Sequence, residues 1–204
     1  DLLQEKNALY GRFAVTIKLN ELNYLDTAKF YPDKTPYDKV AHYAVFGGSP
    51  FVNQALRPTA TLRENIVSTI LNPVSAVYLY ASQLLLSDYS VKINAERIFA
   101  VIGNGKKRYS EIEDKLDVKK TGNLAKQMKP LRDLEIISRN YPINKLNDSK
   151  KSTFEINDNL LRFYFTFIYK NASALQVLGA EAFYDEYVAP TLTDFISRRF
   201  EGIC

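Results

Sequence analysis

The stretch at residues 119–140, KKTGNLAKQMKPLRDLEIISRN, predicts a helix followed by a strand. Three apolar side chains recur in it at helical spacing and share one face: Leu124, Met128 and Leu131. Asn123 stands directly before them as a suitable N-cap residue. Ile136-Ile137-Ser138-Arg139 then predicts a strand. Because Pro130 has no amide donor, we expect it to bend the helix or to end its first half at Met128 or Lys129.

The residues around this stretch complete the pattern of a winged helix-turn-helix over 91–157. Apolar residues from Ile93 to Ile102 predict a first helix, which the glycines that follow it end. Residues 153–156 predict a second strand, and the polar loop 144–151 between the strands is the expected wing. Three helices followed by a hairpin is the order of elements in a winged-helix domain.

Caps, glycines and prolines set the other predicted helix boundaries. Ser110 and Glu113 have the spacing of a capping box, which predicts a short second helix. Asn20 is the expected N-cap of a helix over residues 24–30. Further helices are predicted at 37–45, 51–56, from Thr61 to 71, at 74–86, at 158–170 and at 181–200. The predicted fold class is therefore mainly α.

Composition excludes several kinds of site and location. Cys204 is the single cysteine, so no disulfide forms within the chain and a reducing, cytoplasmic location is expected. His42 is the single histidine, so a zinc site or a histidine-based triad lacks partners, and a packing or surface role in a helix is favoured. No stretch reaches the roughly 18 apolar residues that a membrane helix requires, so no membrane contact is expected.

The positive charge of the chain is concentrated in one segment. Residues 91–145 hold thirteen basic and seven acidic residues, whereas the rest of the chain holds fourteen basic and sixteen acidic residues. Such a concentration is typical of a nucleic-acid contact, and it is equally compatible with a solvated basic face.

Seven short motifs, in the same order, resemble those of archaeal and bacterial P-loop ATPases of the STAND class, which are AAA+-like. The motifs are Leu9-Tyr10-Gly11-Arg12, Phe46-Gly47-Gly48-Ser49-Pro50, Thr61-Leu62-Arg63-Glu64-Asn65-Ile66, Ile102-Gly103-Asn104-Gly105 with Ser110-Glu111-Ile112, Asn140-Tyr141-Pro142-Ile143, residues 156–165 (INDNLLRFYF) and Arg199-Phe200-Glu201-Gly202-Ile203-Cys204. Together they cover nearly the whole chain.

The resemblance implies four segments of a larger protein. Residues 1–19, with a strand at 13–19, would end the ATPase core, and residues 20–90 would form its helical lid. Residues 91–157 would form the winged helix, and residues 158–204 would begin a domain related to PD-(D/E)xK nucleases. The sequence lacks a Gly-x-x-x-x-Gly-Lys-Ser/Thr loop, so ATP and Mg²⁺ are expected only in an intact parent that adds an N-terminal P-loop core.

The resemblance also implies nucleotide contacts. The proline of the Gly47-Gly48-Ser49-Pro50 motif is expected to pack on adenine, and Arg12 is a candidate phosphate contact. The structural alternatives are a plain loop before a helix that starts at Pro50, and a surface ion pair for Arg12.

The turn and outer face of the third winged-helix helix carry candidate nucleic-acid contacts: Lys119, Lys120, Asn123, Lys126, Gln127 and Lys129. The alternative is a winged helix that serves only as a regulatory packing module. Two functions follow: the lid and winged-helix part of a nucleotide-regulated ATPase that is incompetent for hydrolysis alone, or a DNA-binding regulatory module with duplex DNA as its partner.

Overall fold

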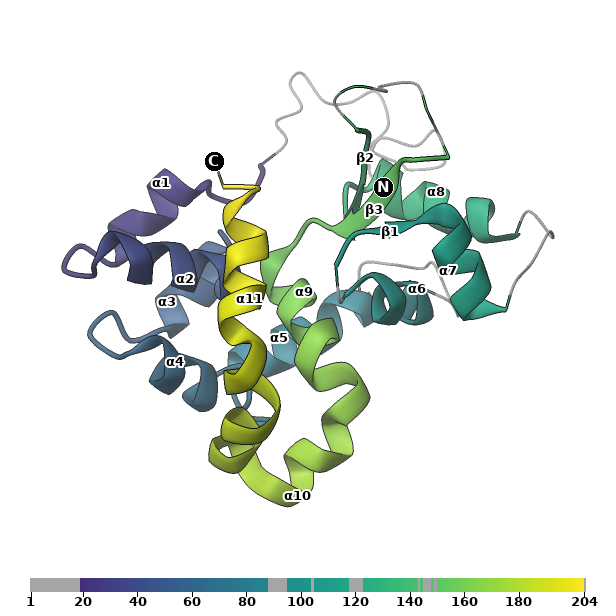
Figure 1. Cartoon of the computed structure of the whole chain (residues 1–204). Coiled ribbons are helices and arrows are strands. Elements are labelled where there is room, and N and C mark those ends of the chain that lie inside the picture. Colours follow the sequence, from purple (N-terminus) through teal and green to yellow (C-terminus); the bar gives the residue numbers. More distant parts are fainter. Residues whose placement is uncertain are drawn as a thin grey trace, which may run out of the picture.

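The computed structural model describes residues 19–87, 95–103, 105–117, 123–142, 144, 148 and 150–203. The protein is mainly helical with a small three-stranded antiparallel sheet, which confirms the predicted fold class. Figure 1 shows helices α1 to α4 on one side, the sheet with α6 to α8 on the other, and α5 with the C-terminal helices between them. Within the described part of the chain, no helix is long and apolar enough to cross a membrane.

The first group of helices is α1 (Tyr24–Thr27), η1 (Ala28–Phe30), α2 (Pro36–Phe46), α3 (Pro50–Ala55), α4 (Leu62–Ser68) and α5 (Ala76–Ser87). Thr61 begins α4 as predicted, in a capping box with Glu64. The predicted cap at Asn20 is wrong, because the side chain of Asn23 accepts the amide of Asp26 at 3.0 Å. Asn20 stands one turn too early to reach the free amides of a helix that begins at Tyr24.

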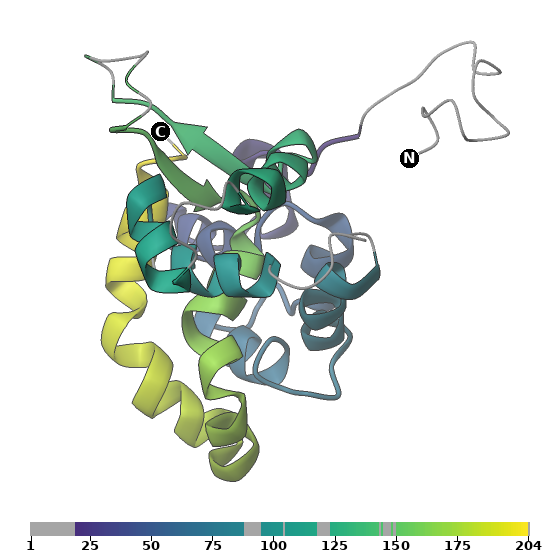
Figure 2. The ribbon, with the colours of Figure 1, turned by 90° about the vertical axis from the view of Figure 1, so that its right-hand side faces the viewer.

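The second group is α6 (Ala95–Ile102), β1 (Lys107–Arg108), α7 (Tyr109–Leu116), α8 (Asn123–Asp133), β2 (Ile137–Asn140) and β3 (Thr153–Ile156). The helices and the hairpin follow in the predicted order, and β1 adds an edge strand that the sequence did not indicate. The sheet order is β1-β3-β2, with Lys107 opposite Phe154 and Ile137 opposite Ile156. Figure 2 shows the β2–β3 hairpin extending beyond the helices at the top of the molecule.

The predicted capping box is wrong, and one of the two alternatives for Pro130 is excluded. Helix α7 begins at Tyr109 rather than after Ser110, and the carboxylate of Glu111 accepts the amide of Arg108 at 2.6 Å. The capping carboxylate therefore stands two residues earlier than Glu113. Helix α8 continues through Pro130 to Asp133, so its first half does not end at Met128 or Lys129. Met128 and Leu131, on either side of the proline, are both buried in one core.

The C-terminal residues form a helical hairpin. Its first arm joins α9 (Asn159–Phe163), a π-helical turn η2 (Tyr164–Ile168), η3 (Tyr169–Asn171) and α10 (Ala172–Phe183), and its second arm joins a π-helical turn η4 (Tyr184–Val188) to α11 (Ala189–Phe200). Figure 1 shows α11 returning alongside α9. Gly179 breaks the regular backbone of α10 with a φ of 75°.

Two hydrophobic cores share the helix that starts at Asn159. The first core combines residues 31–81 with residues 160–196, and the second combines residues 95–156 with Leu161 and Phe165. Leu160, Phe163 and Phe167 enter the first core from the same helix. Arg162 adds a buried ion pair across this junction, with 2.9 Å between its Nη2 and Oε2 of Glu155 on β3. Residues 160–196 are thus packed with residues 31–81, while the predicted division into domains stays a prediction.

Candidate functional site

The Gly47–Pro50 turn connects α2 to α3 and is held rigidly from inside. Gly47 ends α2 with a φ of 70°, and its amide donates to the carbonyl of Tyr43 at 2.9 Å. The buried amide group of Asn53 donates to the carbonyls of Gly47 and Ser49, at 3.0 and 2.8 Å. Pro50 opens α3 as predicted and is exposed. The turn is thus a fixed platform with one apolar ring on its surface.

Gly48 is needed for a contact within the chain. The amide of Leu22 donates to the carbonyl of Gly48 at 3.0 Å. A Cβ atom at position 48 would lie 1.8 Å from the carbonyl oxygen of Leu22. Any side chain at position 48, alanine or valine, is therefore expected to displace residues 21–22. A glycine in this motif lets another group approach its backbone closely. Here the group that approaches Gly48 is the backbone of residues 21–22 of the same chain.

A pair of carboxylates lies beside this turn. The carboxylate of Glu21 accepts the amide of Gly48 at 3.4 Å, and Asp158 caps α9 by accepting the amide of Leu161 at 2.7 Å. Burial of its carboxyl end and the nearby charge of Asp158 raise the pKa of Glu21 to about 7, although the residue as a whole is exposed. Burial likewise raises the pKa of Asp158. Each of the two carboxyl groups therefore keeps its proton to a higher pH than a free carboxyl group does.

The carboxylate pair faces a cavity of about 590 Å³ between the two groups of helices. Tyr43 and Tyr80 line it from the first group, and residues 134–136 line it from the second. Asn159 fixes the same junction by donating to the carbonyl of Tyr43 at 2.7 Å. No sequence pattern marks this pair, because Glu21 and Asp158 are far apart in the chain and meet only through folding.

The predicted nucleic-acid residues are only partly visible. Lys119 and Lys120 lie outside the described residues, as does the predicted phosphate contact Arg12. Asn123 is the first residue of α8. Lys126 and Lys129 are exposed on α8, as the predicted contact requires, and Gln127 is half-buried.

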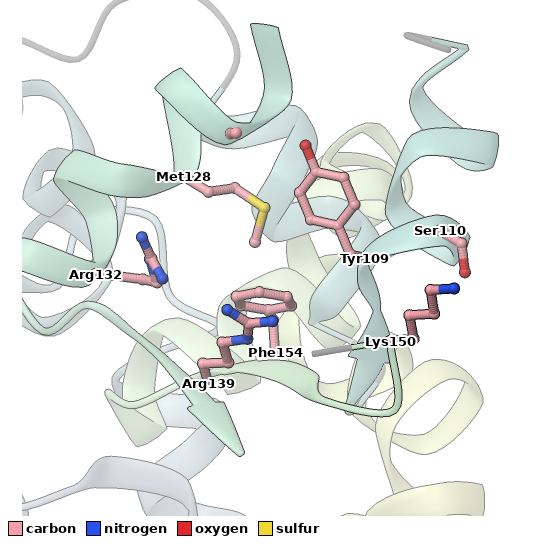
Figure 3. Close-up of a pocket in the computed structure, with 8 residues that line it drawn as sticks. Tyr109, Ser110, Met128, Arg132, Arg139, Lys150 and Phe154 are labelled. Atoms are coloured by element: carbon pink, nitrogen blue, oxygen red, sulfur yellow. The ribbon is translucent and has the colours of Figure 1, made fainter. Parts of the chain in front are cut away.

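A cavity of about 490 Å³ lies between α8, the start of α7 and the hairpin. Its apolar wall is formed by Tyr109, Met128 and Phe154, and its polar rim by three basic residues: Arg132, Arg139 and Lys150. Figure 3 shows the arginine side chains on one side of the Phe154 ring and Lys150 with Ser110 on the other. Among the described residues that line this cavity, none is acidic. Sequence reasoning missed it because its residues come from four elements.

Arg139 is held in place by its neighbours. Its Nε donates to the hydroxyl of Ser152 at 2.8 Å, and Ser152 is fully buried. Its guanidinium carbon lies 5.0 Å from the ring centre of Tyr141 and 5.6 Å from that of Phe154. Stacking on aromatic rings is a geometry that guanidinium groups favour.

His42 has the packing role that was predicted. It is buried, its Nδ1 lies 2.7 Å from the carbonyl oxygen of Asp38, and its Nε2 lies 3.2 Å from the amide nitrogen of Asn65. Burial lowers the pKa of His42, which favours the neutral ring. Among the described residues, no group of three histidine, cysteine or acidic side chains is placed to hold a metal ion.

The comparisons with known proteins give one similarity. The chain is 26% identical over 176 residues to the uncharacterized protein MJECL04 of Methanocaldococcus jannaschii. The aligned part is 86% of this chain and 39% of that protein, so the chain spans about two fifths of the length of the relative it matches. No family model matches the chain. No solved structure matches it either.

Proposed function

We propose that this chain is the lid and winged-helix part of a nucleotide-regulated ATPase, in which an N-terminal P-loop core supplies most of the contacts to ATP and Mg²⁺. The observation that carries the proposal is the helix starting at Asn159, which contributes side chains to both hydrophobic cores. Its capping residue Asp158 lies beside the Gly47–Pro50 turn. A nucleotide seated on that turn would therefore act directly on the helix that joins the two groups.

Several contacts tie the turn to this helix. The segment at 21–22 is bonded to Gly48, and Glu21 is hydrogen-bonded to Asp158 at the start of α9. Asn159 is bonded to Tyr43 in the last turn of α2. Residues Leu161 and Phe165 then carry any displacement into the second core. Close-packed interiors transmit such movements as rigid bodies, which suits a regulatory role.

The test uses the longer parent protein with its P-loop core. Pro50→Ala should weaken ATP binding about tenfold, because the proline ring would lose an apolar contact with adenine. Pro190→Ala is the matched control, since Pro190 is also exposed and also lies in the first turn of a helix. Calorimetry on both variants measures the difference. Equal affinities would contradict a nucleotide contact at the turn.

The chain alone should show no magnesium-dependent ATP hydrolysis, since its sequence lacks the phosphate-binding loop. Turnover above background by the pure 204-residue chain would overturn this part of the proposal.

A DNA-binding module is the second candidate function, and the basic residues on and beside α8 favour it. With about four phosphate contacts, log affinity for duplex DNA should fall with log salt at a slope near −3.6, from about micromolar affinity or weaker at physiological salt. Replacing the exposed Lys126 and Lys129 by alanine should reduce that slope by about 1.8. Anisotropy titrations of a labelled duplex at several salt concentrations measure both values. An unchanged slope would remove α8 from the contact.

A further inference from the structure

The cavity between α8 and the hairpin combines features that select one kind of ligand. Its volume of about 490 Å³ lies in the range of small-molecule sites, roughly 300–1,000 Å³. Three basic side chains and no acidic one line it among the described residues, so an anionic group is favoured. Met128 and Phe154 are buried in its apolar wall, and the half-buried ring of Tyr109 offers aromatic surface, so a planar ring attached to the anion is favoured as well.

Two neighbouring acidic side chains are already engaged. Glu111 accepts the amide of Arg108, and Glu155 pairs with Arg162. They therefore do not neutralise the basic rim from within the cavity. The guanidinium of Arg139 is oriented in advance by Ser152 and by two aromatic rings, which lowers the entropy lost when it binds an anion. Arginine binds phosphate through paired hydrogen bonds, and a guanidinium held in one orientation presents its donors in a fixed geometry.

We propose that this cavity binds one nucleotide of an unpaired nucleic-acid strand, with its phosphate at Arg132 and Arg139 and its base against Tyr109. Bases in a duplex are stacked and paired, whereas those of a single strand turn outwards and stack on aromatic side chains. Lys150 lies across the cavity, where it meets the next phosphate of the strand (Figure 3). The inference rests on the second candidate function only in assuming that residues 95–156 contact nucleic acid, and it does not depend on the ATPase.

The test compares two strands and two charge-matched variants of the whole chain. The probes are fluorescein-labelled oligothymidylate and a duplex of the same length, both at low salt. One double variant, Arg132→Ala with Lys150→Ala, removes two exposed charges from the cavity rim. The other, Lys126→Ala with Lys129→Ala, removes two exposed charges from α8 outside the residues that line the cavity. Each loses the same net charge, so a general electrostatic effect lowers both affinities equally.

We expect the rim variant to weaken oligothymidylate binding at least tenfold while changing duplex binding less than about threefold. Tyr109→Leu should weaken oligothymidylate about tenfold and Tyr109→Phe should leave it unchanged, with thermal melting to confirm that both variants fold. Equal losses in the two double variants, or no binding of oligothymidylate, would overturn the proposal. Tighter binding of an acidic tyrosine-containing peptide than of oligothymidylate of the same charge would also overturn it.

Competition separates the two sources of a nucleotide. Thymidine monophosphate displacing the labelled strand where inorganic phosphate does not would support the cavity with a free nucleotide as ligand. Selective loss in the rim variant without such displacement would support a strand as ligand. Loss of duplex binding confined to the Lys126 and Lys129 variant bears on the DNA-binding function, so that function and the cavity succeed or fail separately.

Discussion

Gly48→Ala should destabilise the protein through a single contact that the structure defines. The added methyl group would lie 1.8 Å from the carbonyl oxygen of Leu22 and 2.8 Å from its carbonyl carbon. Ordinary contacts between such atoms are about 3.5 Å. These neighbours are backbone atoms, which cannot swing aside as a side-chain end can. Residues 21–22 must therefore move away from the turn by more than an ångström.

The cost follows from what that movement breaks. The hydrogen bond from Leu22 to Gly48 contributes about 1 kcal/mol, and partial exposure of the half-buried Leu22 side chain costs about another 1 kcal/mol. Because φ at Gly48 is not positive, alanine also gains about 0.4–1 kcal/mol by restricting the unfolded chain. The net loss in unfolding free energy is about 1–2 kcal/mol. At about 2–4 °C per kcal/mol for a chain of this size, Tm falls by about 2–8 °C.

Thermal melting and hydrogen exchange measure this loss, with Gly202→Ala as the matched control. A Cβ atom at position 202 would approach a side-chain nitrogen of Arg199 at 3.3 Å, which needs to give by only a few tenths of an ångström, so its effect should stay within about 0.5 kcal/mol. The Leu22 amide should lose its exchange protection in Gly48→Ala alone. If Gly48→Ala melts at the same temperature as Gly202→Ala and its Leu22 amide keeps its exchange protection, the packing argument for the turn is refuted.

Two further predictions concern the junction. The pKa of Glu21 is raised to about 7 in the folded protein, so the folded state holds a proton that the unfolded state releases above about pH 4.5. Stability should therefore fall as pH rises from about 4.5 to 7. Urea unfolding at pH 5 and 8 should show this fall in the native chain and a smaller one in Glu21→Gln, and equal falls in both would contradict the prediction. Phe165→Ala should lower the free energy of unfolding by about 3–5 kcal/mol. It should also lower hydrogen-exchange protection in α2 as well as α6, because the helix that carries Phe165 belongs to both cores. Unchanged protection in α2 would show that the cores unfold independently.

The sequence predicted the elements well where local signals set them. Apolar spacing with glycine and proline at the ends placed α2 within one residue, and the strand at 153–156 matches β3. Errors arose where two local signals competed over a few residues, as with Asn20 against Asn23. The two-residue strand β1 consists of Lys107 and Arg108, and it forms only because β3 offers it a partner. No local pattern marks such a strand.

The candidate sites depended on folding to a greater degree. The glycine turn was identified from its motif, yet its second glycine meets Leu22 rather than open space. The Glu21–Asp158 pair and the cavity at Arg132, Arg139 and Lys150 bring together residues from distant segments. Burial and neighbouring charge, which decide their chemistry, arise only in the folded chain.

The internal role of Gly48 changes which residues bear on nucleotide binding. A glycine that a ligand requires and a glycine that the fold requires leave the same trace in a sequence, so the motif alone cannot distinguish them. Here the fold accounts for Gly48, and Gly47 is accounted for by its positive φ at the end of α2. Pro50 has no such internal reason, since it is exposed and alanine is also compatible with the first turn of a helix. The nucleotide hypothesis therefore depends on Pro50, and the ATP affinity of the Pro50→Ala variant of the parent is the measurement that decides it.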